Sequence, residues 1–309
     1  MSAVGRRPHS SAAEGVWRLV DPKITMASVA SLFLGAAAAA RAGPLSWWWL
    51  ALTVLAVFFI EVAKNASGEV VDFDSGADAA VAPEDRSPFS GGKRVLVDGL
   101  LSRAQVVAAA GVAYRLAVAA GMAIVLAREP RVLGIGAAGL ALAFFYHAPP
   151  LRLSYRGLGE LAVAACYGPL IAVGAYLVQR GEITADVVLP SLPLGLMVAA
   201  FLWINEFPDC SADRAAGKRT LVVRLGRRQA SRAFLALVLC AYALVLLLPR
   251  AGAPAGVVLG LLGAPLGLRA ARRLMAQHQS TAAIVPAQAW TLVSFLLLAA
   301  GEGVGLLLR

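Results

Sequence analysis

Residues 61–78 read EVAKNASGEVVDFDSGAD, and residues 205–221 read NEFPDCSADRAAGKRTL. Together with Glu84 and Asp85, which follow the first stretch, they hold ten of the chain's 18 Asp and Glu residues. Each stretch continues a long apolar run. Carboxylates at the end of such a run are costly to bury, so their presence there indicates a functional site. Both the fold and the chemistry of the chain therefore depend on these two acidic stretches.

The chain around the two stretches is too apolar for a water-soluble domain. Of its 309 residues, 59% are hydrophobic and 15% are charged, and the mean hydropathy is +0.73. Soluble domains carry about 25% charged residues. The composition therefore predicts an integral membrane protein that lies in a lipid bilayer.

Nine apolar runs are long enough to cross a bilayer. They lie at roughly 24–42, 46–64, 104–127, 131–147, 158–179, 187–206, 232–249, 252–269 and 284–307. We therefore predict an all-α integral membrane fold with nine transmembrane helices. We expect a single transmembrane domain over residues 16–309, preceded by a disordered tail at residues 1–15.

The distribution of basic residues predicts how the helices are oriented. Loops on the side of the acidic stretches carry 21 Lys and Arg residues, whereas the opposite loops carry six. Because basic loops stay in the cytoplasm, we expect a cell-membrane protein with its acidic stretches facing the cytoplasm and its C-terminus outside. The same rule explains the net charge of +10 without nucleic acid, since no basic patch with interleaved aromatic residues is present.

The first acidic stretch forms a stripe on one helix face. Residues four and seven apart in an α-helix point the same way, so Asn65, Glu69 and Asp72 share a face. Asp78 follows Gly76, where we expect the helix to end. An alternative is that these acids are solvated loop residues, but that interpretation fits poorly for a stripe that begins inside an apolar run.

The second acidic stretch repeats every four residues, at Asn205, Asp209 and Asp213. Oxygen ligands of this kind suit Mg²⁺, which takes one or two carboxylates, keeps some waters and bridges to substrate phosphates. No His or Cys residue is spaced to complete a zinc site. Two such stripes facing each other predict a site for Mg²⁺ and a diphosphate.

Each acidic stretch leads into a similar basic segment. Gly91–Leu100 and Ala216–Leu225 agree at six of ten positions, including the pairs Lys93-Arg94 and Lys218-Arg219. Lys and Arg can hold departing phosphate oxygens. The alternative is that these charges only set the orientation of the helices, which is our interpretation for Arg227, Arg228 and Arg232.

A third polar segment, residues 146–160, joins two predicted helices. It carries Arg152 and Arg156, four residues apart, and Tyr155 between them. We expect this segment to form a lid or an acceptor contact. The alternative is an ordinary loop anchored at the membrane surface.

Residues 65–78, 146–160 and 205–226 resemble the UbiA superfamily of intramembrane prenyltransferases. The resemblance extends from about Arg18 to the end of the chain. The spacing of Gly76 and Asp78 and the run Gly217–Leu221 are most similar to the branch that prenylates 1,4-dihydroxy-2-naphthoate in menaquinone biosynthesis. The resemblance implies nine helices around a central cavity with an active site on the cytoplasmic side.

The resemblance also implies a reaction, namely Mg²⁺-dependent transfer of a polyprenyl group from an allylic polyprenyl diphosphate to an aromatic acceptor, a hydroxynaphthoate. The metal ligands that it implies are Asn65, Glu69, Asp72, Asp78, Asn205, Asp209 and Asp213. We expect catalytic roles for Asp72, Asp209, Lys218 and Arg219. We expect substrate contacts from Lys93, Arg94, Arg152, Tyr155, Arg156, Lys218 and Arg219.

One departure from this branch leaves the acceptor open. The branch usually carries Asn-Asp where this chain has Gly68-Glu69. A second hypothesis therefore keeps the diphosphate site but changes the acceptor to a hydroxybenzoate, a lipid alcohol, a sugar phosphate or haem. An ion-coupled transporter is a further alternative, although the acids gather at one membrane face. A non-catalytic partner protein is disfavoured because both acidic motifs keep their charge.

Overall fold

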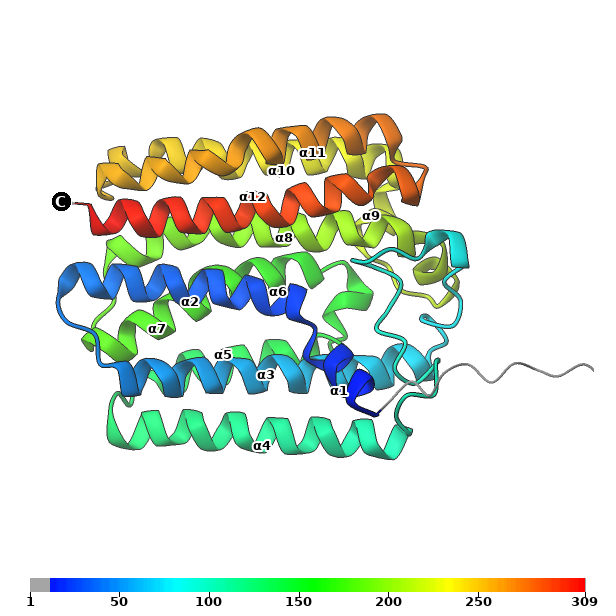
Figure 1. Ribbon diagram of the computed structural model, residues 1–309, viewed down its shortest axis with the longest axis horizontal. Helices are drawn as coiled ribbons and strands as arrows, with labels where there is room; N and C mark the ends of the chain where they lie inside the picture. Colours follow the sequence, from blue (N-terminus) through cyan, green and yellow to red (C-terminus); the bar gives the residue numbers. More distant parts are fainter. Residues whose placement is uncertain (1–11, 309) are drawn as a thin grey trace, which may run out of the picture.

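The computed structural model describes residues 12–308, and this part of the chain is helical with no β-strand. The α-helices are α1 (Ala12–Val20), α2 (Pro22–Ala42), α3 (Trp47–Asp74), α4 (Arg103–Ala127), α5 (Val132–Phe145), α6 (Gly159–Ala165), α7 (Ile171–Arg180), α8 (Ala185–Ala215), α9 (Leu221–Leu225), α10 (Arg227–Leu247), α11 (Ala264–Gln277) and α12 (Thr281–Leu307). Shorter helical segments are η1 (Pro83–Asp85), η2 (Leu153–Arg156), η3 (Cys166–Leu170), η4 (Leu248–Ala251) and η5 (Ala255–Gly263). The long helices lie side by side along one common direction (Figure 1).

The predicted all-α membrane fold is confirmed, but the count of nine spans is not. Among residues 12–308, eight helical segments are long and apolar enough to cross a membrane. The predicted span at 131–147 corresponds to α5, which has 14 residues. At 1.5 Å per residue it is about 21 Å long, which is shorter than a hydrocarbon core of about 30 Å.

The N-terminal tail differs in part from the prediction. Helix α1 begins at Ala12, inside the stretch expected to be disordered, and residues 1–11 lie outside the described residues. The chain then turns at Asp21, whose φ of 49° is left-handed, and Pro22 begins α2. This turn places the Asp21 carboxylate beside the loop that precedes α4, where it pairs with Lys93.

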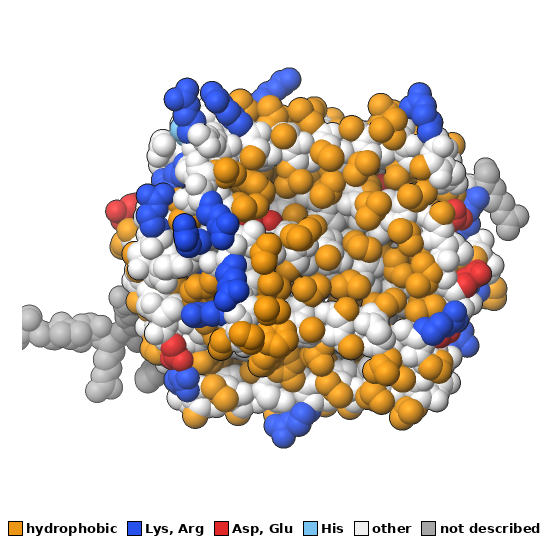
Figure 2. Space-filling view, turned by 180° about the vertical axis from the view of Figure 1, so that it is seen from behind, with side chains coloured by type: hydrophobic (Ala, Val, Ile, Leu, Met, Phe, Trp, Pro, Cys, Tyr) orange, Lys and Arg blue, Asp and Glu red, His pale blue; other side chains and the backbone are white. Residues whose placement is uncertain are grey.

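The surface agrees with a position in the bilayer. Apolar side chains cover the middle of the bundle, and Lys and Arg side chains gather mainly toward one end (Figure 2). Exposed apolar side chains include Leu126 on α4, Leu161 on α6 and Leu262 on η5. Lipid replaces water around such a belt, so these residues need no cover from protein.

Helix α8 forms the centre of the bundle. It packs against α2, α6, α10 and α12, and most of its apolar part is buried. Between Val187 and Ile204 it carries no charged residue. The acidic stripe therefore begins where the central helix leaves its apolar surroundings, at the same end of the bundle as the end of α3 (Figure 1).

A close helix crossing shapes the wall beside α8. A Cβ atom on Gly168 would lie 2.7 Å from the backbone oxygen of Ser191 on α8, so only glycine permits this approach. Pro169 follows, and the backbone at Gly168 leaves helical geometry. The break ends α6 and starts α7, and it holds Tyr167 next to α3, where its hydroxyl donates a 2.9 Å hydrogen bond to Glu61.

Candidate active site

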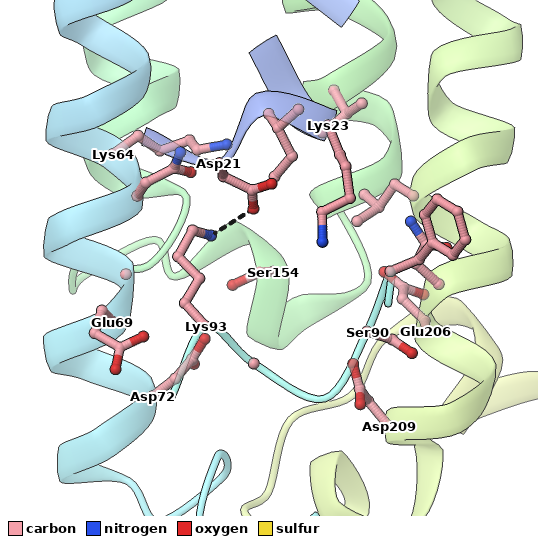
Figure 3. A pocket seen from close by; sticks show the side chains of 18 of the residues that line it. Asp21, Lys23, Lys64, Glu69, Asp72, Ser90, Lys93, Ser154, Glu206 and Asp209 are labelled. Carbon is pink, nitrogen blue, oxygen red and sulfur yellow. Dashed lines mark ion pairs between the residues drawn. The ribbon is translucent and has the colours of Figure 1, made fainter. Parts of the chain in front are cut away.

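A cavity of about 610 Å³ lies at the end of the bundle where α3 and α8 finish. It is lined by the α1–α2 turn, α3, the loop between α3 and α4, the residues around 146–167, and α8. Figure 3 shows Glu69 and Asp72 on α3 across from Glu206 and Asp209 on α8. The two acidic stretches, 133 residues apart at Asp72 and Asn205, thus face a common space.

On α3 the acidic side chains are held by neighbours. The Glu69 carboxylate accepts a 2.8 Å hydrogen bond from the backbone N–H of Leu96. The Asp72 carboxylate accepts a 3.0 Å hydrogen bond from the Tyr155 hydroxyl. Asn65 donates to the backbone oxygen of Leu19 at 3.1 Å, and its own side-chain oxygen is buried without a partner among the described residues.

Helix α3 ends at Asp74, close to the expected position, and Asp78 returns to the cavity. Gly92, with φ of +74°, lies against it, and a Cβ atom there would stand 2.3 Å from an Asp78 carboxylate oxygen. Burial, with the nearby charges of Asp72 and Glu69, raises the pKa of Asp78 to about 7. Asp74 instead pairs with Arg103 at 2.7 Å on the outside of the bundle.

On α8 two of the acidic side chains have an oxygen without a hydrogen-bond partner in the described part of the chain. One carboxylate oxygen of Glu206 and one of Asp209 are buried without a hydrogen-bond donor among residues 12–308. The side-chain oxygen of Asn205 accepts a 3.1 Å hydrogen bond from Gln288 on α12. Unpaired buried oxygens carry a free-energy cost, so this wall has unused capacity to bind a cation.

Lys218 joins the two walls. Its ammonium lies 3.8 Å from Asp72 of the first stretch and 3.5 Å from Asp213 of the second. Burial disfavours the charged ammonium, but the carboxylates of Asp72 and Asp213 outweigh it and raise the pKa of Lys218 well above its usual value. A single cation thus contacts both acidic stripes at once.

Most of the predicted site residues lie together in this cavity. The lining includes Asn65, Glu69, Asp72, Asp78, Lys93, Arg94, Asn205, Asp209, Asp213 and Lys218. Lys93 pairs with Asp21 at 3.2 Å, and the Arg94 side chain contacts Asp98 at 3.2 Å and the backbone oxygen of Asp78 at 3.1 Å.

Four predicted substrate contacts do not line the cavity. Arg219 is exposed, and its backbone N–H donates to Tyr155. Arg152 stacks on the Tyr155 ring at 4.3 Å, and Arg156 donates to the backbone oxygen of Pro150. Tyr155 holds Asp72 from behind the wall, whereas Tyr146, His147 and Ser154 of the same segment line the cavity.

The sequence interpretation missed several lining residues, of which Lys64 and His147 are the most informative. His147 lines the cavity and places Nδ1 4.0 Å from Asp72. Burial lowers the pKa of His147 to about 3, so its imidazole is neutral. A Cβ atom on Gly68 would stand 2.6 Å from His147 Nε2. The Gly at position 68 was the sequence signal, because it makes room for this ring.

The donor set fits a hard divalent cation. Among the described residues no three His, Cys, Asp or Glu side chains are close enough to hold a metal by themselves. Mg²⁺ needs only one or two carboxylates, with water and substrate phosphates completing the shell. Asn65 on one wall and Asp209 on the other each present a buried oxygen without a donor, as such a shell requires.

The profile of the UbiA prenyltransferase family matches residues 28–301. The chain is 28% identical over 250 residues to 1,4-dihydroxy-2-naphthoate octaprenyltransferase from Mycobacterium tuberculosis, covering 81% of this chain and 82% of that protein. It is 25% identical over 215 residues to the protein of that name from Bacillus subtilis, covering 70% and 67%. It is 29% identical over 170 residues to 2-carboxy-1,4-naphthoquinone phytyltransferase from Synechocystis, covering 54% and 52%.

Solved structures agree in fold. A UbiA homolog from Aeropyrum pernix superposes with a TM-score of 0.70 at 21% identity, covering 91% of this chain and 97% of that one. A UbiA homolog from Archaeoglobus fulgidus, bound to GPP and Mg²⁺, superposes with a TM-score of 0.63 at 14% identity, covering 93% and 99%. At these identities the likeness establishes the arrangement of helices.

Proposed function

The chain belongs to the UbiA prenyltransferase family, and we propose that it transfers a polyprenyl group from an allylic diphosphate to an aromatic acceptor, 1,4-dihydroxy-2-naphthoate, in an Mg²⁺-dependent reaction of quinone biosynthesis. The observation that carries the proposal is the position of Lys218, within 4 Å of Asp72 on one wall and Asp213 on the other. Acidic groups from both stretches thereby meet a basic group at one point, as a metal–diphosphate site requires.

Mg²⁺ would be held by Asp209 and Asn65, which have unpartnered oxygens, and by Asp72, Asp78 and Asp213 around them. When bound, the metal neutralises the diphosphate and makes it a better leaving group. We include Glu69 and Asn205 in this set as predicted, and we add Glu206, which lines the cavity with an unpartnered oxygen.

The basic side chains would hold the leaving group. Lys218 and Lys93 lie within the cavity, where their ammonium groups can contact phosphate oxygens. The allylic C–O bond breaks, and its electron pair leaves with the diphosphate. A carbon of the electron-rich acceptor ring then forms the new C–C bond and releases either its proton or its carboxyl group as CO₂.

Apolar residues would protect the allylic cation from water. Ile24 and Ala27 on α2 and Val198, Phe201 and Leu202 on α8 line the cavity between its polar groups. Such walls hold the prenyl chain and keep water from quenching the cation. They also keep the acceptor carbon within reach of the allylic carbon, at a separation of about 3–3.5 Å.

The acceptor assignment rests on relatives whose names include 1,4-dihydroxy-2-naphthoate octaprenyltransferase. We further propose that the protein lies in the cell membrane as a single transmembrane domain, with the cavity open to the cytoplasm and the C-terminus outside. The excess of Lys and Arg on the cavity side supports this orientation.

A transfer assay tests the proposal. The purified protein is incubated in detergent with Mg²⁺, a polyprenyl diphosphate and one acceptor at a time, and the products are identified by mass. We expect a prenylated product from 1,4-dihydroxy-2-naphthoate that disappears with EDTA. Product from 4-hydroxybenzoate, a lipid alcohol or haem instead would reassign the acceptor, and no product from any acceptor would refute prenyl transfer.

A further inference from the structure

All the lysines of the chain line the main cavity. The chain has four lysines and 24 arginines, and all four lysines line the cavity: Lys23, Lys64, Lys93 and Lys218. Positive charge that only orients a membrane protein can be carried by either residue type. Lysine supplies a compact charge on a flexible stem, so its restriction to the cavity indicates that these four ammonium groups serve ligands there.

Three of the four lysines already have partners. Lys218 lies between Asp72 and Asp213, and Lys93 pairs with Asp21. Lys23 donates to the backbone oxygen of Pro88. The Lys64 ammonium makes no hydrogen bond and no ion pair within 4.0 Å to any residue of the described range 12–308. Its ammonium is therefore available to an anion from outside the chain.

Aromatic rings surround this available cation. The Lys64 ammonium lies 5.8 Å from the centre of the Tyr146 ring and 5.9 Å from that of Tyr167. Both distances are within the range of cation–π contacts, about 6 Å. Figure 3 shows Lys64 extending from α3 toward the space that Lys23 and Lys93 also enter. A flat, apolar ring can pack against the tyrosines while its anionic group meets the ammonium.

Neighbouring acids do not neutralise Lys64 directly. Glu61, one turn earlier on α3, accepts the Tyr167 hydroxyl at 2.9 Å, and Asp21 is paired with Lys93. Both carboxylates lie more than 4.0 Å from the Lys64 ammonium. Lys23, Lys64 and Lys93 line the main cavity with Asp21, and Glu61 lines the smaller cavity beside Lys64.

The position of Lys64 separates it from the metal–diphosphate site. Asp72 lies eight residues after Lys64 along α3, which corresponds to about 12 Å of helix. A second, mainly apolar cavity of about 90 Å³ shares Lys64, Tyr146 and Tyr167 with the main one and continues toward Val57 and Leu142. The Lys64 ammonium thus faces two tyrosine rings and an apolar cavity without an ion pair among the described residues, whereas Lys218 pairs with two carboxylates.

We propose that Lys64, Tyr146 and Tyr167 form the acceptor subsite, and that this subsite recognises the carboxylate of an aromatic acid. The inference deepens the proposed function and rests on it, because it assigns the acceptor end of the same cavity. The Lys64 ammonium binds the carboxylate, and the two tyrosine rings contact the acceptor ring. The acceptor ring then lies on the apolar side of the diphosphate, next to the allylic carbon.

The alternative source of an anion at Lys64 is the prenyl diphosphate itself. The diphosphate has its own cations in Lys218 and Lys93, and aromatic rings offer nothing specific to a phosphate group. The observations therefore favour the aromatic acid, and the experiment includes an arm for each ligand.

Equilibrium binding to the full-length protein in detergent provides the test, without turnover. The probes are 1,4-dihydroxy-2-naphthoate, 1,4-dihydroxynaphthalene, which lacks the carboxylate, and geranyl diphosphate with Mg²⁺. We expect the wild type to bind the acid at least about tenfold more tightly than the carboxylate-free ring. Lys64→Met should abolish that difference, whereas Lys64→Arg should keep most of it.

Each contrary result has a defined meaning. If the wild type binds both ring compounds equally, or if Lys64→Met weakens both equally, the subsite does not recognise a carboxylate. If Lys64→Met weakens geranyl diphosphate instead of the acid, Lys64 belongs to the diphosphate site. Retained geranyl diphosphate binding in Lys64→Met shows that the variant is folded.

A kinetic arm separates this inference from the proposed function. In the transfer assay, Lys64→Met should raise the KM for the acid about tenfold or more and leave the KM for the diphosphate unchanged. If no acceptor is prenylated while the wild type still prefers the acid over the carboxylate-free ring, the proposed reaction fails and the subsite stands. If transfer proceeds with an unchanged acceptor KM in Lys64→Met, the reaction stands and the subsite fails.

Discussion

The acidic end of α3 and the acidic end of α8 carry the same residue types in the same cavity, yet their surroundings differ. On α3, Glu69 and Asp72 each accept a hydrogen bond, from Leu96 and from Tyr155. On α8, Glu206 and Asp209 each keep a buried oxygen without a donor in the described part of the chain. The two α3 carboxylates are therefore held by protein contacts, whereas Glu206 and Asp209 on α8 each keep one oxygen without a donor among residues 12–308.

The basic segments that follow α3 and α8 also differ in what their lysines contact. Lys218, which follows α8, reaches across the cavity to Asp72 on α3. Lys93, which follows α3, turns away from both acidic stripes and pairs with Asp21 at the α1–α2 turn. Similar sequences therefore take different positions: Lys218 contacts both acidic stripes, whereas Lys93 pairs with Asp21.

Removal of an unpaired α8 carboxylate should cause the largest loss. Asp209→Asn keeps the size of the side chain but removes the charge that would bind metal. We expect the rate of prenyl transfer to fall by on the order of 10³-fold. The measurement is initial rate at saturating Mg²⁺ with both substrates.

Asp74→Asn is the matched control for this change. Asp74 lies at the end of α3 but pairs with Arg103 outside the cavity, where both side chains are about half exposed. Its replacement should alter the rate less than about twofold, because an exposed ion pair contributes little. A large loss in this variant, or near-normal rates in Asp209→Asn, would contradict the proposal that Asp209 binds the metal.

The bridging cation should matter next. Lys218→Met removes a charge that stabilises the departing diphosphate and leaves Asp72 and Asp213 to repel each other. We expect a loss of about 10²-fold in rate, with partial recovery as Mg²⁺ is raised. Arg219→Met is the control, because Arg219 is exposed and lines no part of the cavity. Equal losses in the two variants would show that Lys218 has no special role.

The pH dependence should identify Asp78 as part of the metal site. Its pKa is raised to about 7, so the carboxyl is protonated below that pH and charged above it. Metal binds the charged form, and the apparent Mg²⁺ affinity should therefore fall about tenfold per pH unit as the pH drops below 7. Asp78→Asn should bind Mg²⁺ weakly at every pH and lose this dependence. An unchanged pH profile in the variant would exclude Asp78 as the titrating group.

The sequence predicts the acidic stripes well because helical spacing alone aligns Asn65, Glu69 and Asp72, and charge at the end of an apolar run is rare enough to be noticed. It does not predict Lys64 or Asp21, because their places depend on where α1 and α2 cross α3. Arg219 is a residue that the sequence wrongly places in the cavity. Its neighbour Lys218 lines the cavity, but Arg219 is exposed, because the turn directs consecutive side chains to opposite sides.

The predicted number of membrane spans differs from the structure for the same reason, because helix ends depend on packing with distant segments. Hydropathy identifies a run such as 131–147, but it cannot show that the helix spans Val132–Phe145 and then gives way to the irregular segment that holds His147. That segment closes the cavity only because Gly68 on α3 leaves space for the imidazole. Helix ends near a functional site follow side-chain packing between distant segments, which a local pattern does not contain.

The smallest expected effect belongs to a contact behind the α3 wall. Tyr155→Phe removes the hydroxyl that donates to Asp72 at 3.0 Å and keeps the ring on which Arg152 stacks. One such hydrogen bond contributes about 1–1.5 kcal/mol, so the rate should fall about five- to tenfold. Because Tyr155 positions Asp72 without touching substrate, the loss should appear in kcat, with both KM values little changed. An unchanged kcat in Tyr155→Phe would show that the ligand alone orients Asp72 and that the hydrogen bond from Tyr155 is not needed.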